Sequence, residues 1–417
     1  MKVLPARPPT CNEQNILRID CSKVFFSPLS RVRISGWVYL CCFHQHSNLW
    51  LNLIRLRETR LFTEGIVVKR INVGVLGYGL VQSFFHMPCY KEIPQANVVA
   101  VGGRRKKALV EFADRWRIRK RYSGDDFIEK LCADSRVEVV DIGLPNFLHE
   151  KAAKVASENG KHVICEKPLA RSVSEAKAML KAVEKAKVID CYAENQVFIP
   201  HVVKAKESIE NGVVGDPFWI RSREAHSGPH SAWFLDPELA GGGVLMDMGC
   251  HSIEVARYLF GGKPVQACAW GASIVHETKA EDNSLALVKY EGDKLGQSEN
   301  SWAAHGGLDL RFEIYGSDGS IFIDPTRETG LKVFTIAPEE KVGYVVEKAE
   351  VKRGWLYPVW REHEVYGYSF ELQHFVTCLL EGETPKETFR DGYIVNCIID
   401  ACYRSMKSEK WERIRMT

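Results

Sequence analysis

The sequence predicts an α/β protein with a doubly wound parallel sheet in its N-terminal part and a second, mostly antiparallel open sheet after it. Three observations support this fold class. Apolar strands alternate with helices from about residue 71 to residue 186, and a glycine-rich turn follows the first strand. After about residue 192, strand-like segments succeed one another with short connections. Alternating strands and helices favour a parallel sheet, whereas consecutive strands favour an antiparallel one.

Strands with near-continuous apolar character define the first sheet, and each is followed by a helix of ordinary length. The expected strands are Ile71–Leu76, Asn97–Val101, Val137–Gly143 and His162–Cys165. The expected helices are Gly79–Tyr90, Lys106–Trp116, Asp125–Ala133, Leu148–Glu158 and Ser172–Ala186. Ser172 with Glu175 three residues later is a capping box at the start of the last helix.

The second sheet is expected from six segments with strand character. These are Phe218–Arg223, Val265–Ile274, Ser284–Tyr290, Gly296–Ala303, Leu308–Tyr315 and Ile321–Ile323. Helices are expected near His201–Asn211, up to Leu259, at Phe370–Leu380 and at Asp391–Met406. These helices are too few to cover both faces of the sheet. An uncovered apolar face predicts association into a homo-dimer or homo-tetramer through the C-terminal sheet.

The chain divides into three predicted regions. Residues 1–66 show no helical or strand periodicity, so they are interpreted as a dispensable extension, disordered or added by a misassigned start. A targeting peptide is the alternative, because arginine exceeds acid there. Residues 67–191 are expected to bind a dinucleotide, and residues 192–417 to bind substrate and form subunit contacts.

Composition and charge exclude several classes of protein. The chain of 417 residues is 45% hydrophobic and 26% charged, with a formal net charge of only +3, so no nucleic-acid partner is expected. The best apolar stretch, Ile34–Phe43, is half of the ~20 residues that a membrane span needs, so no membrane partner is expected. The 13 cysteines form no CxxC pair, which favours reduced thiols in a cytoplasmic protein.

A dinucleotide fingerprint follows the first strand. In Gly77-Tyr78-Gly79-Leu80, the first glycine permits a tight turn and the second lets the pyrophosphate approach a helix N-terminus. Gln82 stands where the fingerprint has glycine or alanine, which predicts looser packing of the helix on the strand without loss of binding.

The end of the second strand predicts the preferred cofactor. An NAD site has an acidic residue there for the ribose 2′-hydroxyl. This chain has Arg104 and Arg105 instead, whose guanidinium groups suit a 2′-phosphate. NADP(H) is therefore the expected cofactor, with NAD(H) as the alternative, although the arginines would also suit a solvated basic helix start.

Polar residues follow two further strands at the edge where an open α/β sheet binds ligands. Pro145 and Asn146 follow one strand, and Glu166, Lys167 and Pro168 follow the next. A lysine at this position can face the reacting end of a dinucleotide. Pro145, Asn146, Glu166 and Lys167, together with His149, complete the expected cofactor contacts.

Asp247 and His251 supply the other half of a proton-transfer site. They lie four residues apart after Gly241-Gly242-Gly243, so they are expected on one face of a single helix. A helix cap for Asp247 with a core histidine is one alternative. A metal site is another, but it would need further ligands such as His226, His230 or Asp236, and we expect no metal. The segment from Glu224 to His230, which includes His226, is interpreted as a substrate loop with Trp233 as an apolar platform. Asn195 is a further expected substrate contact.

Together these motifs resemble the Gfo/Idh/MocA family, the glucose–fructose oxidoreductase and inositol dehydrogenase group, over about residues 68–414. The resemblance also rests on Ile314–Ser320 and Asp391-Gly392. It implies a Rossmann domain, a second α/β domain that forms subunit contacts, and catalytic roles for Lys167, Asp247 and His251. The segment Tyr192–Gln196 departs from the more basic sequence of many members, which leaves the usual sugar-binding pattern open.

The resulting hypothesis is an NAD(P)-dependent oxidoreductase. Hydride moves between nicotinamide and a secondary alcohol or carbonyl of a sugar, polyol or related compound. His251 exchanges the hydroxyl proton, Lys167 stabilises charge on the oxygen, and Asp247 orients His251 or shares its charge. Two alternatives are an NAD-dependent glycoside hydrolase on the same fold and a non-catalytic NAD(P)-binding sensor.

Overall fold

The computed structural model describes residues 69–338 and 353–416. The chain divides into the units Met1–Val68 and Lys69–Thr417, and the description below concerns the second. The predicted extension, residues 1–66, therefore lies outside the described residues. No helix in the described part is long and apolar enough to cross a bilayer.

The first sheet contains six strands in the order β3-β2-β1-β4-β5-β6, and all neighbours pair in parallel. The strands are β1 (Ile71–Leu76), β2 (Ala96–Gly102), β3 (Lys120–Tyr122), β4 (Val139–Ile142), β5 (His162–Glu166) and β6 (Asp190–Ala193). The parallel sheet was predicted, but the short strands β3 and β6 were not. The strand order reverses between β1 and β4, and the carboxyl ends at such a switch point form the ligand crevice of open α/β sheets.

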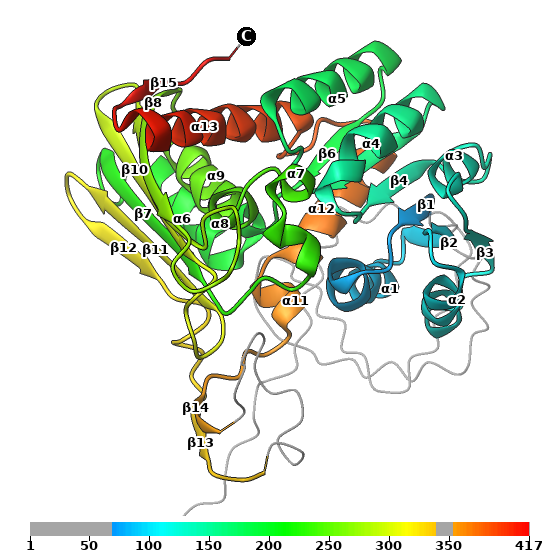
Figure 1. Cartoon of the computed structure of the whole chain (residues 1–417), viewed down its shortest axis with the longest axis horizontal. Coiled ribbons are helices and arrows are strands. Elements are labelled where there is room, and N and C mark those ends of the chain that lie inside the picture. The colour runs from blue at the N-terminus through cyan, green and yellow to red at the C-terminus, as the bar shows by residue number, and fades with distance from the viewer. Residues whose placement is uncertain (1–68, 339–352, 417) are drawn as a thin grey trace, which may run out of the picture. The chain divides into compact units, whose positions relative to one another are not determined.

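Helices connect these strands (Figure 1). They are η2 (Gln82–His86), α1 (Met87–Glu92), α2 (Lys106–Arg115), α3 (Phe127–Cys132), η3 (Asn146–Leu148), α4 (His149–Glu158) and α5 (Val173–Ala186). The predicted cap of α5 is confirmed, because the Ser172 side chain accepts a hydrogen bond from the Glu175 backbone N–H. The helix ends at Lys187, which has a left-handed backbone with φ of 56°.

The first helix contains a wide π-helical turn, η2, around the unusual fingerprint residue Gln82. Gln82 is fully buried, and a Cβ placed on Gly143 would lie only 2.6 Å from its Nε2 atom. The Nε2 atom also donates to the Asp141 carboxylate over 2.9 Å. The expected loose packing is therefore absent, because Gly143, directly after β4, leaves the room that the larger side chain fills.

The second sheet has seven strands in the order β12-β11-β7-β10-β9-β8-β15. They are β7 (Pro217–Ala225), β8 (Pro264–Ala272), β9 (Asn283–Tyr290), β10 (Lys294–Ser301), β11 (Asp309–Gly316), β12 (Ser320–Ile323) and β15 (Glu412–Arg413). The prediction of a mostly antiparallel sheet is confirmed. The one parallel pairing joins β7 to β10.

Helices α9 and α13 pack on one face of this sheet (Figure 1). The helices of this half are η4 (Asn195–Phe198), α6 (Pro200–Glu210), η5 (Ala232–Leu235), α7 (Pro237–Ala240), α8 (Val244–Asp247), α9 (Gly249–Phe260), α11 (Glu362–Val365), α12 (Tyr368–Glu381) and α13 (Phe389–Ser408). On the opposite face, Trp270, Leu285 and Phe322 are exposed. A separate two-stranded sheet pairs β13 (Val333–Thr335) with β14 (Gly354–Leu356).

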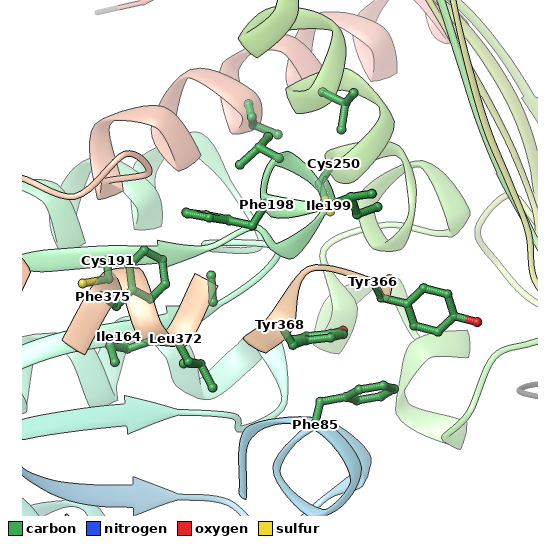
Figure 2. Packing of buried hydrophobic residues seen from close by; sticks show 14 of the residues in the cluster. Phe85, Ile164, Cys191, Phe198, Ile199, Cys250, Tyr366, Tyr368, Leu372 and Phe375 are labelled. Carbon is green, nitrogen blue, oxygen red and sulfur yellow. The ribbon is translucent and has the colours of Figure 1, made fainter. Parts of the chain in front are cut away.

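One apolar core contains buried residues of both sheets and of α12. Leu372 and Phe375 of α12 pack with Ile164 and Cys191 of the first sheet, as Figure 2 shows. All nine cysteines of the described part are free, and eight of them are buried.

Candidate active site

A cavity of about 720 Å³ runs along the switch point of the first sheet and is lined by residues of both halves. Its lining includes the turn Gly77–Leu80, Arg104, Arg105, Pro145 and Asn146 from the first half. Asn195, Glu224, His226, Trp233, Asp247 and His251 line it from the second half, together with Glu166 and Lys167. The structure therefore brings together all of the predicted site residues except His149.

The glycine turn has the geometry that a pyrophosphate cradle needs. Gly77 has φ of +105°, and a Cβ there would lie 2.3 Å from the Gly143 carbonyl oxygen, so only glycine fits. A Cβ on Gly79 would meet nothing within 4 Å, which leaves open space beside the turn. The helix that begins at Leu80 can direct its free N–H groups into this space.

The turn after β2 is organised by Tyr78. The Arg105 backbone N–H donates to the Tyr78 hydroxyl over 3.1 Å, and the Arg105 guanidinium lies 5.9 Å from the ring centroid. A Cβ on Gly103 would lie 2.1 Å from the same ring, so glycine is required here as well. Arg104 is exposed and lines the cavity, as does Asp125 from the loop before α3.

The residues after β4 divide between the cavity and the core. Asn146 is buried and donates to the Ala240 carbonyl over 2.8 Å, which ties this loop to α7. His149 is fully buried, with Nε2 2.8 Å from the Leu144 carbonyl oxygen and Nδ1 3.0 Å from that of Pro168. His149 thus holds the two loops that carry Asn146 and Lys167, and it does not line the cavity.

A buried ionic network fixes Glu166. Its Oε1 atom lies 2.9 Å from His86 Nε2, and Asp141 Oδ2 lies 2.8 Å from His86 Nδ1. Burial alone would lower the pKa of His86, but the two carboxylates outweigh it and raise that pKa well above 6.5. His86 is therefore an imidazolium. Because Glu166 Oε2 accepts the Lys167 backbone N–H over 3.1 Å, the network also fixes the backbone at Lys167.

Lys167 reaches across the cavity to Asp247. Its Nζ atom lies 2.9 Å from the Asp247 carbonyl oxygen and 3.2 Å from Oδ1. The other carboxylate oxygen, Oδ2, accepts a hydrogen bond from Trp302 Nε1 over 3.0 Å. Burial opposes the charge on Lys167, but Asp247, supported by Cys250, Glu224 and Glu166, outweighs it, and together they hold the pKa of the ammonium well above its usual value. The site therefore contains a fixed cation.

The spacing predicted one continuous helix for Asp247 and His251, but the structure places them in two helices. Asp247 ends α8, and His251 lies in α9 after a break at Met248. The Asp247 carbonyl accepts from Lys167, and the His251 backbone N–H instead donates to Met248 over 3.1 Å. The Asp247 carbonyl is thus bound by Lys167 at the point where the helical turn tightens before His251.

His251 contacts a carboxylate that the sequence analysis did not select. Its Nδ1 atom lies 2.5 Å from Oε1 of Glu194, the residue that follows β6. Both side chains are buried, with exposed fractions of 4% for His251 and 0% for Glu194. The sequence signal was present in the unusual segment Tyr192–Gln196, but it gave no partner.

Polar side chains line the part of the cavity beyond Lys167. The buried Glu224 carboxylate accepts from Gln196 Nε2 over 2.7 Å, and Asn195 Nδ2 donates to the Tyr366 carbonyl over 2.7 Å. The rings of His226 and His230 stack with centroids 5.2 Å apart. Trp233 stacks on Phe234 at 3.8 Å, which gives this region an aromatic wall.

Phe85, Tyr366 and Tyr368 are among the aromatic lining residues that were missed from the sequence. Phe85 of η2 stacks on Tyr368 of α12 with centroids 4.4 Å apart (Figure 2). Tyr366 points away from the α12 core in the same view and lines the cavity. Residues so distant in sequence give no local signal that they share a wall.

Two clusters in the described residues have spacings that could hold a metal ion. They are Glu194 with Cys250 and His251, and Glu254 with Glu387 and Asp391. Neither includes His226, His230 or Asp236, the further ligands considered from the sequence. Asp236 instead caps α7, where it accepts from the Glu238 N–H.

The fold and the cavity define a dinucleotide-binding protein with a lysine and a histidine at the ligand edge of its sheet. Residues 71–194 match the family model described as the oxidoreductase family with an NAD-binding Rossmann fold. Residues 202–322 match the GFO/IDH/MocA C-terminal domain. The chain belongs to the Gfo/Idh/MocA family of oxidoreductases, as the motifs predicted.

Relatives of known activity cover most of the chain. Levoglucosan dehydrogenase of Pseudarthrobacter phenanthrenivorans is 28% identical over 82% of this chain and 98% of its own length. Myo-inositol 2-dehydrogenase of Thermotoga maritima is 27% identical over 82% and 97%. Among solved structures, GenD2 from gentamicin A biosynthesis in complex with NAD superposes with a TM-score of 0.78 at 26% identity, covering 84% of this chain and 98% of that one.

Proposed function

We propose that this oxidoreductase transfers a hydride between NADP(H) and a secondary hydroxyl carbon of a neutral sugar or polyol. The observation that supports this most directly is the cavity itself, in which Lys167 and His251 lie at the end of a sheet whose first turn can cradle a pyrophosphate. Relatives named levoglucosan dehydrogenase and inositol dehydrogenase support the same class of substrate. When bound, the nicotinamide supplies the acceptor or donor for the hydride.

In the oxidation direction, His251 takes the hydroxyl proton while Lys167 stabilises the negative charge that develops on the oxygen. Asp247 and Trp302 hold Lys167 in place through the contacts described above. Asn195, Glu224, His226 and Trp233 would contact the remaining hydroxyl groups and the apolar face of the substrate.

The charges around Lys167 favour a neutral substrate. Glu166, Glu224 and Asp247 contribute carboxylates to the cavity lining, and Lys167 is already paired with Asp247. Among the lining residues, the other lysines and arginines are Arg104, Arg105 and Lys151, on the Rossmann side. A substrate with a phosphate or carboxylate would therefore be repelled near His251.

The preference for NADP(H) rests on the turn after β2, where Arg104 and Arg105 line the cavity and Tyr78 orders their backbone. Gly77, Gly79 and Leu80 would hold the pyrophosphate, and Pro145, Asn146 and Glu166 would lie along the rest of the cofactor. The free cysteines favour a reducing, cytoplasmic environment. The face of the second sheet that carries Trp270 and Phe322 favours a homo-dimer or homo-tetramer.

The test is a panel of cyclic polyols, anhydrosugars, sugar phosphates and sugar acids, each mixed with the enzyme and either NADP+ or NAD+. We expect cofactor reduction with neutral compounds, with His251→Ala as the matched inactive control. Reduction only with the acids or phosphates would overturn the substrate class. Release of sugar from a glycoside without net cofactor reduction would instead favour the glycoside hydrolase alternative.

A further inference from the structure

Glu194 is a buried acid that faces the ring of His251 from another part of the fold. It follows β6 of the first sheet, whereas His251 lies in α9 of the second half, 57 residues away. The Glu194 Oε1 atom also accepts the Gln196 backbone N–H over 3.3 Å, so the carboxylate has a fixed position. A short contact between a carboxylate and an imidazole nitrogen requires a hydrogen atom between them.

The contact selects one tautomer of the imidazole. When Nδ1–H donates to the carboxylate, the lone pair is left on Nε2, and Nε2 is then the atom able to accept a proton. His251 lines the cavity, so a substrate hydroxyl there can reach the ring. The opposite tautomer would place a hydrogen on Nε2, and its basic nitrogen would be Nδ1, which faces Glu194 and not the substrate.

Asp247, which the sequence analysis expected to orient His251, has other partners at both carboxylate oxygens. Oδ1 lies 3.2 Å from Lys167 Nζ, and Oδ2 accepts from Trp302 Nε1 over 3.0 Å. The acid that contacts His251 Nδ1, and that can orient the ring, is therefore Glu194.

We propose that Glu194 is a positioning residue of this active site, whose carboxylate holds His251 in the tautomer that exchanges a proton with the substrate through Nε2. The proposal rests on the proposed function of His251 as the base, and it extends that function to a residue that does not itself contact the substrate. In oxidation, the hydroxyl proton passes to Nε2, the hydride leaves the same carbon for nicotinamide, and Glu194 stabilises the imidazolium that results.

The hydrogen bond between Glu194 and His251 joins two groups whose pKa values are displaced in opposite directions. Burial raises the pKa of Glu194 to about 8, although Lys167 opposes this effect. Burial and then Lys167 lower the pKa of His251 to about 4. Because the two groups share one hydrogen bond, they are treated as a pair with two pKa values. The pair loses one proton at the upper pKa, and it binds a further proton only at a pH below the lower pKa. Above the upper value the pair is a carboxylate with an Nδ1–H imidazole, which is the form that oxidation needs.

Other charged groups act on the pair from each neighbouring element, and a pH profile reflects all of them. They are Glu166 of β5, Lys167 after it, Glu224 of β7, Asp247 of α8 and the thiol of Cys250 on α9 itself. Cys250 donates to the Asp247 carbonyl over 3.2 Å, so its sulfur already has a partner. This contact favours a hydrogen-bonded pair over a metal at Glu194, Cys250 and His251.

Two substitutions separate orientation from charge. Glu194→Met removes the acceptor, whereas Glu194→Gln keeps an acceptor oxygen and removes the charge. Glu371→Gln is the matched control, because Glu371 is another fully buried acid, in α12, outside the cavity lining. Cofactor affinity and circular dichroism report folding for all three variants.

The first readout needs no substrate. Nitrogen-15 NMR of labelled histidine, with His251→Asn to assign the signal, reports which ring nitrogen carries the hydrogen above the upper pKa. We expect Nδ1–H in the wild type, in Glu194→Gln and in Glu371→Gln, and a shift toward Nε2–H in Glu194→Met. An Nε2–H tautomer in the wild type, or no change in Glu194→Met, would overturn the proposal whatever the substrate is. Metal bound in the purified protein and lost with Glu194→Met would also overturn it.

The second readout is the pH profile of turnover. Glu194→Met should lower kcat at least ~10²-fold, the lower end of what a general base contributes, with little change in KM. In Glu194→Gln, the ionisation near the upper pKa should disappear from the profile. A wild-type profile in Glu194→Gln, or equal losses in Glu194→Met and Glu371→Gln, would contradict the positioning role. If no compound turns over, the proposed function is in doubt while the NMR result still decides the role of Glu194.

Discussion

Removal of the charge on Lys167 should disable turnover while leaving the cofactor site intact. Lys167→Met keeps the unbranched chain up to the position of Cε but leaves Asp247 without the ammonium 3.2 Å from its Oδ1 atom. The side chains of this pair are only 15% and 12% exposed. Breaking a buried pair costs about 3–5 kcal/mol, and the partial exposure favours the lower end of that range. Loss of one group that stabilises the reacting oxygen should lower kcat by ~10²–10³-fold.

The same change should move the pH profile of oxidation in a defined direction. Lys167 lowers the pKa of both Glu194 and His251, so its removal raises both. Oxidation needs the deprotonated pair, and its ascending limb should therefore shift to higher pH. Cofactor affinity should change little, because the pyrophosphate is expected at Gly77–Gly79.

The assay combines urea unfolding, cofactor titration and turnover against pH. Lys161→Met is the matched control, since Lys161 Nζ donates to the carbonyls of Asp134 and Val137, away from the cavity lining. The control should lose stability without a shift in the pH profile. Turnover within a few fold of wild type in Lys167→Met, with an unmoved profile, would refute the reasoning.

Three further predictions concern the cofactor, the core and the subunit contact. Arg104→Ala should weaken NADPH binding by about 1.5–3 kcal/mol and leave NADH binding nearly unchanged in fluorescence titrations. Asp125→Asn, the control, should alter the binding of neither cofactor. Equal affinity of the wild type for both cofactors would argue against the assignment. Burial, reinforced by Glu166, raises the pKa of Glu371 well above 4.5. Above pH 4.5 the native protein therefore keeps the Glu371 proton while the unfolded chain releases it. The free energy of unfolding that this proton contributes is lost as pH rises. Glu371→Gln should therefore gain stability over wild type by ~1.4 kcal/mol per pH unit above about pH 4.5 in urea unfolding, and a pH-independent difference would contradict this. Trp270→Glu on the open sheet face should shift an oligomer toward monomer in light scattering, and a wild-type protein that is already monomeric at micromolar concentration would exclude the predicted contact.

The sequence predicted the parts of the fold whose signals are local. The turn at Gly77–Gly79 follows an apolar strand, and Ser172 precedes a helix with Glu175 in its first turn, so each was recognisable without the rest of the chain. The mostly antiparallel second sheet followed from consecutive strand-like segments. The three-residue strand β3 was too short and too polar to produce such a signal.

The partners within the site could not be predicted, because they depend on contacts between distant segments. The Glu194–His251 contact spans 57 residues, and the His86–Glu166 contact spans 80. Sequence spacing also placed Asp247 and His251 on one helix, but the Lys167 ammonium takes the Asp247 carbonyl where the helix is interrupted. Tertiary contacts of this kind override the helical pattern that the local sequence favours.

The most direct test of the central claim follows the hydride itself. A neutral polyol that reduces the cofactor is prepared with deuterium on the carbon that becomes oxidised, and the reduced nicotinamide is analysed by mass spectrometry and NMR. The account predicts one deuterium on the nicotinamide ring and a slower single turnover than with the unlabelled compound, with both signals lost in His251→Ala. Reduced cofactor without deuterium would contradict direct hydride transfer in this cavity. Product formed without any net reduced cofactor would contradict a net oxidation of the substrate.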